Sequence, residues 1–178
     1  MLTRGRETGQ IGVMDLVVKG SGTALWKGRT LRCAVGRGGI NAGKREGDGA
    51  TPAGRFPMRF LLFRPDRLGA PPTGLPLRAI ERDDGWCDAP TDHAYNSLIR
   101  LPYSAHAEAI WRADEVYDLV VPLGFNDMPV LAGLGSAIFL HVATADFAPT
   151  AGCIALAKPD LLAVLAEADQ QSGVVTEA

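Results

Sequence analysis

Residues 136–157 read SAIFLHVATADFAPTAGCIALA, and this stretch decides how the rest of the chain is interpreted. Up to His141 the side chains alternate with a period of two, which predicts a β-strand that ends at the histidine. The following ATADFAPTAG has the Asp, Pro, Thr and Gly content of a loop, and a second apolar run begins at Cys153. We therefore expect two neighbouring strands to bring an imidazole and a thiol to the same edge of a sheet.

This pair of side chains has a chemical use. The thiolate is the reactive form of cysteine, and an adjacent imidazolium lowers the thiol pKa, so the sequence predicts an ionised pair between Cys153 and His141. Gly152 can take a positive φ and turn the amides of residues 152 and 153 toward one point, as an oxyanion hole requires. The alternative is that both are core residues, since free cysteine is among the most buried residue types.

The residue pattern of this stretch resembles that of the L,D-transpeptidase catalytic domain (the YkuD-like family). Its signature is a histidine at a strand end, a loop, and Ser/Thr-x-Gly-Cys before an apolar strand. The matching residues here are His141, Thr150, Gly152, Cys153, Ile154 and Leu156. A second block, KREGDGATPAGRFPM over residues 44–58, is similar to the family's Gly-Asp-Gly-x-Thr-Pro-x-Gly-x-Phe segment. Its matching residues are Gly47, Asp48, Gly49, Thr51, Pro52, Gly54 and Phe56.

Two positions depart from the family pattern. Many members carry a second histidine before the Gly-Cys pair and an arginine soon after the cysteine, where this chain has Ala151 and Ala155. The loop from His141 to Cys153 is also short, which indicates a divergent branch. Neither missing side chain is the nucleophile or its base, so the departures concern substrate placement and any oxyanion contribution from the missing groups.

The resemblance implies a cysteine acyltransferase that cross-links or remodels the cell wall. Cys153 would attack a peptidoglycan stem peptide or precursor to form a thioester, and a carbapenem would add to the same sulfur. His141 would protonate the leaving amine and be oriented by the backbone carbonyl of Val142, with Asp146 as the competing orienter. Candidate substrate-binding residues are Thr150, Tyr95, Asn96 and Asn126.

Three other readings stay open. With water as the acceptor the same site is an L,D-carboxypeptidase. Without the second histidine the chain could be a catalytically inert wall-binding module. A redox-sensing thiol protein is the third.

Composition excludes several classes of function. The net charge of −2 comes without a basic stripe, so no nucleic-acid partner is expected. The three cysteines, Cys33, Cys87 and Cys153, lack zinc-site spacing, so neither a metal nor a cofactor is expected. A bridge between Cys33 and Cys87 cannot be read from the sequence, and two buried free thiols are favoured.

The length of 178 residues indicates one domain. Residues 1–13 are expected to be a flexible leader, 14–170 the catalytic domain, and 171–178 a frayed tail. The family implies the cell envelope or periplasm, yet no apolar signal-peptide core and no transmembrane segment is present, so action in the cytoplasm is the alternative.

The expected fold is mainly β: a YkuD-like β-sandwich of mixed strands with two peripheral helices. Short apolar or alternating segments separated by Gly and Lys turns predict most of the strands. The helices are expected at 104–114, with Trp111 as a core anchor, and at 159–168, where Pro159 stands in the first turn.

Overall fold

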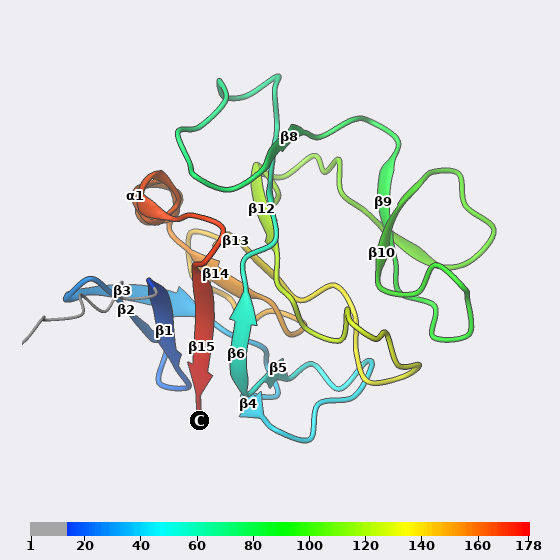
Figure 1. The fold of residues 1–178 in the computed structure, drawn as a ribbon, viewed down its shortest axis with the longest axis horizontal. Helices are drawn as coiled ribbons and strands as arrows, with labels where there is room; N and C mark the ends of the chain where they lie inside the picture. The colour runs from blue at the N-terminus through cyan, green and yellow to red at the C-terminus, as the bar shows by residue number, and fades with distance from the viewer. Residues whose placement is uncertain (1–13) are drawn as a thin grey trace, which may run out of the picture.

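The computed structural model describes residues 14–178, which form a curled, mainly β domain (Figure 1). The main sheet has ten strands in the spatial order β6 (Gly54–Pro57), β15 (Gly173–Glu177), β1 (Asp15–Lys19), β2 (Thr23–Trp26), β3 (Arg29–Ala34), β14 (Ile154–Leu156), β13 (Phe139–Val142), β12 (Leu119–Pro122), β7 (Leu61–Phe63), β8 (Leu77–Ala79). A second sheet has the order β10 (Ser97–Arg100), β9 (Asp84–Cys87), β11 (Ala107–Ala109). A parallel pair is formed by β4 (Ile40–Asn41) and β5 (Thr51–Pro52).

The first three strands form because their sequence alternates and their turns suit tight hairpins. In β1 the side chains of Leu16 and Val18 are fully buried, with less buried residues between them. The hairpin from β2 to β3 turns at Lys27 and Gly28, which both have positive φ, at 46° and 77°. Two such residues are what a two-residue turn needs to match the twist of its strands.

The two halves of the main sheet share one hydrophobic core. Trp26 from β2 and Leu61 from β7 belong to the same buried cluster, although their strands lie in opposite halves of the strand order. Met58, after β6 at one edge, bridges to Leu123 after β12, so the chain crosses between the halves there. The predicted β-sandwich of mixed strands is confirmed, with both facing layers supplied by one curled sheet.

The helix α1 (Lys158–Glu167) lies outside this sheet, where the sequence predicts a helix at 159–168 (Figure 1). It buries Leu161, Val164 and Leu165. The predicted helix at 104–114 is wrong. Residues 107–109 instead form β11, which pairs antiparallel with β9, Glu108 standing opposite Trp86. A short isolated helix is marginal in water, whereas pairing with β9 satisfies the backbone directly.

The expectation of a frayed tail at 171–178 is also wrong. Strand β15 lies between β6 and β1, parallel to β1 and antiparallel to β6, and Val174 is fully buried. The last strand is therefore an interior strand of the sheet, next to the edge strand β6. The predicted leader, residues 1–13, lies outside the described residues. In the part of the chain that is described, no helix has the length and apolar content needed to cross a membrane.

Candidate active site

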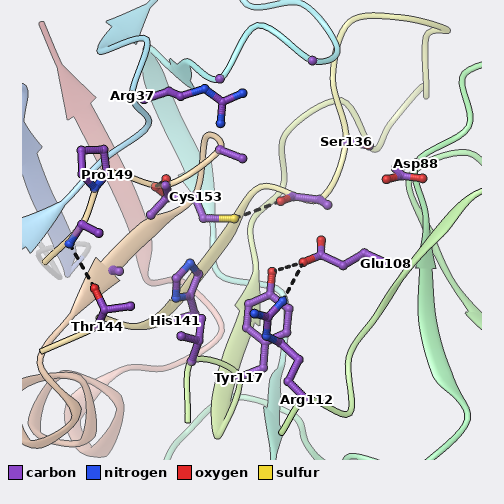
Figure 2. A pocket seen from close by; sticks show the side chains of 18 of the residues that line it. Arg37, Asp88, Glu108, Arg112, Tyr117, Ser136, His141, Thr144, Pro149 and Cys153 are labelled. Atoms are coloured by element: carbon purple, nitrogen blue, oxygen red, sulfur yellow. Dashed lines mark hydrogen bonds and ion pairs between the residues drawn. The ribbon is translucent and has the colours of Figure 1, made fainter. Parts of the chain in front are cut away.

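The parallel strands β13 and β14 bring the predicted imidazole and thiol together. Leu140 pairs with Ile154 and His141 with Ala155, so Cys153, one residue before β14, lies level with Phe139 at the start of β13. His141 stands two residues further along β13. Both side chains are largely buried, and Figure 2 shows them next to each other at one cavity. The expected meeting of the two strands is therefore present.

The thiol of Cys153 has two backbone partners. Its Sγ donates to the carbonyl oxygen of Ala137 at 3.2 Å and accepts from the amide of Phe139 at 3.4 Å (Figure 2). Burial raises the pKa of Cys153 to about 12, and the negative charge of Glu108 raises it too. The Phe139 amide and the charge of Lys44 act in the opposite direction but are outweighed. The resting sulfur is therefore a protonated thiol.

The ring of His141 is fixed by its own strand. Nδ1 lies 2.9 Å from the carbonyl oxygen of Val142, which can only accept, so Nδ1 carries the proton and Nε2 keeps a free lone pair. Asp146, the competing orienter, instead accepts from Thr144 Oγ1 at 2.7 Å and from the amide of Ala148. Burial lowers the pKa of His141 to about 4, against the opposing effect of the Val142 carbonyl.

The predicted ion pair between Cys153 and His141 is therefore wrong for the resting protein. Burial penalises a thiolate and an imidazolium alike, and it shifts both pKa values toward the neutral forms. In its neutral form His141 has a lone pair on Nε2 that is able to accept a proton.

A tight turn sets the position of Cys153. Gly152 has φ of 140°, and a Cβ added there would lie 2.9 Å from the carbonyl oxygen of Ala50. The hydroxyl of Thr150 donates to the carbonyl of Cys153 at 2.6 Å and accepts from the amide of Gly152 at 3.1 Å. Thr150 lines the cavity, but its hydroxyl is already hydrogen-bonded within this turn. The amide of Gly152 is likewise occupied, because it donates to that hydroxyl.

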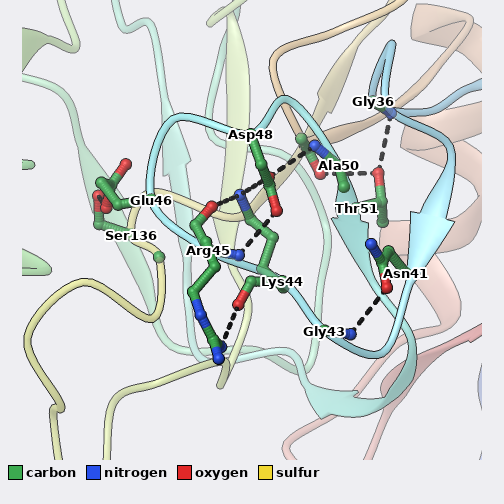
Figure 3. A network of polar contacts seen from close by, with 12 residues as sticks. Gly36, Asn41, Gly43, Lys44, Arg45, Glu46, Asp48, Ala50, Thr51 and Ser136 are labelled. Atoms are coloured by element: carbon green, nitrogen blue, oxygen red, sulfur yellow. Dashed lines mark hydrogen bonds and ion pairs between the residues drawn. The ribbon is translucent and has the colours of Figure 1, made fainter.

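The second sequence block packs against this turn. Thr51 Oγ1 donates to the carbonyl of Gly152 at 2.8 Å and accepts from the amide of Gly36 at 2.8 Å. Asp48 holds the preceding loop through Lys44 Nζ at 2.6 Å and the amides of Arg45 and Ala50 (Figure 3). These bonds join the two motifs that the sequence had linked only by resemblance.

The cavity has a volume of about 350 Å³ and charged walls. The sequence had singled out Cys153, His141 and Thr150, and it missed the charged and phenolic groups around them. These are Arg37, Lys44, Glu46, Asp88, Glu108, Arg112 and Tyr117. Glu108 and Arg112 were missed because a helix was predicted at 104–114. In a helix neither side chain would have been expected to face Cys153 and His141.

Three predicted substrate-binding residues do not line the cavity. Tyr95 donates to Glu46 and accepts from the Gly135 amide at 3.0 Å. Asn96 is buried and bonds Trp86, two backbone carbonyls and the amide of Ala137. Asn126 closes its own loop through the backbone of Leu131 and Gly135. Their polar groups hold the loops that carry the cavity wall.

The remaining cysteines take no part in this site. Cys33 and Cys87 are both free and buried, so no bridge joins them. Burial raises the pKa of Cys33 to about 11. Within residues 14–178, no three His, Cys, Asp or Glu side chains gather in a way that could hold a metal ion.

A mainly β domain with a thiol and a free imidazole nitrogen on two neighbouring parallel strands has the groups that a cysteine-dependent enzyme needs. The family model of the YkuD L,D-transpeptidase catalytic domain matches residues 14–175. The chain therefore belongs to this family.

The comparison with solved structures finds a similar chain in the crystal structure of Mycobacterium tuberculosis L,D-transpeptidase 1, with a TM-score of 0.44 and 13% sequence identity. The similarity covers 93% of this chain and 60% of that chain. This chain thus corresponds to less than two thirds of the length of that structure. No match to a curated protein was found.

Proposed function

We propose that the protein is a cysteine acyltransferase that acts on peptidoglycan stem peptides through a thioester on Cys153. The observation that carries the proposal is the pairing of a buried thiol with an imidazole whose Nδ1 is committed to Val142, which leaves Nε2 free at the same cavity. The cavity size of about 350 Å³ suits a short peptide segment. Such a substrate would place the work of the enzyme at the cell envelope.

The proposed reaction gives each of these groups one role. As Sγ of Cys153 attacks the peptide carbonyl, its proton passes to Nε2 of His141 and the C–S bond forms. The amide of Cys153 is the main-chain donor that we assign to the resulting oxyanion. The imidazolium then gives its proton to the departing nitrogen as the C–N bond breaks, which leaves a thioester and a free amine.

The thioester has two fates. An amine acceptor gives a transpeptidase, and water gives an L,D-carboxypeptidase. The competing function is an inert wall-binding module, which the alanines at 151 and 155 and the high pKa of Cys153 favour. The transpeptidase, the carboxypeptidase and the inert module would share the cavity. They differ in whether Cys153 is acylated and in which acceptor takes the acyl group.

Intact mass measurement with a carbapenem tests the proposal. The wild type should gain the mass of one carbapenem, located on Cys153 by peptide mapping, and Cys153→Ala should gain none. His141→Gln should be acylated about 100-fold more slowly, since a general base contributes at least about this factor. Cys33→Ala is the control and should be acylated like the wild type. A wild type without an adduct from either carbapenem or a stem tetrapeptide would overturn the proposal in favour of the inert module.

A further inference from the structure

Glu108 projects into the cavity from the middle of β11. It pairs with Trp86 across the ladder to β9, and its neighbours Ala107 and Ala109 point to the other face of the strand. The hydroxyl of Tyr117 donates to Glu108 Oε1 at 2.6 Å, and Arg112 lies 3.9 Å from the same oxygen (Figure 2). Within residues 14–178 no hydrogen bond engages Oε2 of Glu108. The carboxylate is thus held in place with one oxygen left for a ligand.

This carboxylate lies on the same side of the thiol as His141. The ring of Tyr117 stands edge-on to the imidazole, with 5.4 Å between the ring centroids. The hydroxyl of the same tyrosine donates the hydrogen bond to Glu108. Figure 2 shows Arg37 on the opposite side of Cys153. Since His141 is the proton carrier, the nitrogen that leaves the substrate must lie on the His141 side. By microscopic reversibility, an entering amine approaches from that side too.

The electrostatics of the cavity favour a cationic ligand. Burial raises the pKa of Glu108 against the lowering effects of the Tyr117 bond and of Arg112. The charge of Glu108 also raises the pKa of the Cys153 thiol. A bound ammonium would offset both unfavourable effects at once, which a water molecule cannot do.

We propose that Glu108 binds the ammonium group of an amine acceptor and takes one of its protons, so that the thioester is transferred to the amine in preference to water. The inference rests on the proposed function and names the acceptor class for that same site. Glu108 would be a catalytic residue of the second half-reaction only.

The proposed step balances. The bound R–NH3⁺ gives one proton to the Glu108 carboxylate, and the neutral nitrogen attacks the thioester carbonyl. The C–N bond forms and the C–S bond breaks. His141 carries a second nitrogen-bound proton to the departing sulfur, which restores the thiol, and the third stays on the new amide. Glu108 then returns its proton to solvent.

Glu108→Gln tests this role, because glutamine keeps an acceptor oxygen for Tyr117 and removes the charge and the base. A stem tetrapeptide serves as donor, with glycinamide as a cationic acceptor and hydroxylamine as an acceptor that is uncharged at neutral pH. Mass spectrometry gives the ratio of transfer to hydrolysis. The variant should lose at least about tenfold in transfer to glycinamide, the scale of a charge-assisted hydrogen bond. It should keep transfer to hydroxylamine within about threefold, and its acylation by a carbapenem should be no slower than in the wild type.

Asp88→Asn is the matched control, since Asp88 also lines the cavity but pairs with His106 at 2.5 Å. Its glycinamide transfer should stay close to that of the wild type. An equal loss in both variants would show a general effect of charge and overturn the inference. Hydrolysis alone in the wild type, despite an acyl-enzyme, would overturn the inference and leave thioester chemistry standing. Without any acyl-enzyme, both proposals fail.

Discussion

Thr51 and Gly152, 101 residues apart, are joined by a hydrogen bond of 2.8 Å from the threonine hydroxyl to the glycine carbonyl. The same hydroxyl accepts from the amide of Gly36, and Thr51 is fully buried. One side chain therefore ties the loop after β3, strand β5 and the turn before Cys153 together. The position of the sulfur depends on this junction.

Thr51→Val should reduce both stability and acylation. Valine matches the shape but leaves the Gly152 carbonyl and the Gly36 amide buried without a partner, which should cost about 3 kcal/mol of unfolding free energy. Misplacement of the turn should slow carbapenem acylation by about tenfold or more. Thr51→Ser keeps the hydroxyl and should recover most of both losses in denaturant melts and mass kinetics. Equal behaviour of the two variants would contradict this account.

Gly152→Ala should abolish acylation while leaving the Cys153 thiol in the chain. Besides its positive φ, the new Cβ would lie 2.9 Å from the Ala50 carbonyl oxygen, so the turn has to shift. Gly28→Ala is the matched control, because Gly28 also has a positive φ of 77° but nothing within 4 Å of an added Cβ. It should lose about 1 kcal/mol of stability and retain acylation by carbapenem. Normal acylation of Gly152→Ala would rule out the crowding argument.

The buried His141 should make stability depend on pH. Its folded pKa of about 4 lies below the value of 6.5 expected when unfolded, so the unfolded chain binds the proton first as pH falls. The free energy of unfolding should therefore decrease between pH 6.5 and 4, by about 3 kcal/mol in total from this group, and no further below that. Urea melts of His141→Gln should show a weaker decrease over this range. Parallel curves for the two proteins would contradict the pKa assignment.

Alkylation of Cys153 should be slow at neutral pH. With a thiol pKa of about 12, the thiolate fraction and the rate with iodoacetamide should rise about tenfold per pH unit up to pH 10 or beyond. Cys33, with a pKa of about 11, provides the internal comparison within the same digest. A fast plateau between pH 6 and 8 for Cys153 would show instead that the ion pair exists at rest.

Removal of residues 173–178 should destabilise the whole domain. The truncation takes β15 from between β1 and β6, exposes both strands and loses the buried Val174. We expect a loss of about 3 kcal/mol or more, judged by thermal and urea unfolding, since burial of one valine alone contributes about 2 kcal/mol. Deleting Ala178 alone removes no strand residue and should change little. A truncated chain as stable as the full one would mean that β15 adds nothing to the sheet.

Patterns local in sequence predicted much of this protein. Alternation identified the strands near the N-terminus, and the apolar runs around His141 and Cys153 identified the two neighbouring strands that bring these side chains together. The expected position of both at one edge of the sheet is wrong, because the parallel register offsets them by two residues. Pro159 at the first turn identified α1. The two motifs also indicated the family, because each is short and contiguous and its residues are read directly from the chain.

Long-range contacts decided the remainder. Residues 107–109 became a strand because β9 offered a free edge, and residues 173–177 became one because β1 and β6 left a gap between them. The neutral state of Cys153 and His141 follows from burial, which depends on every strand around them. The sequence alone determined which side chains meet at the site. Only the tertiary structure decided their protonation and placed Glu108 and Tyr117 beside them, since both depend on desolvation and pairing between distant segments.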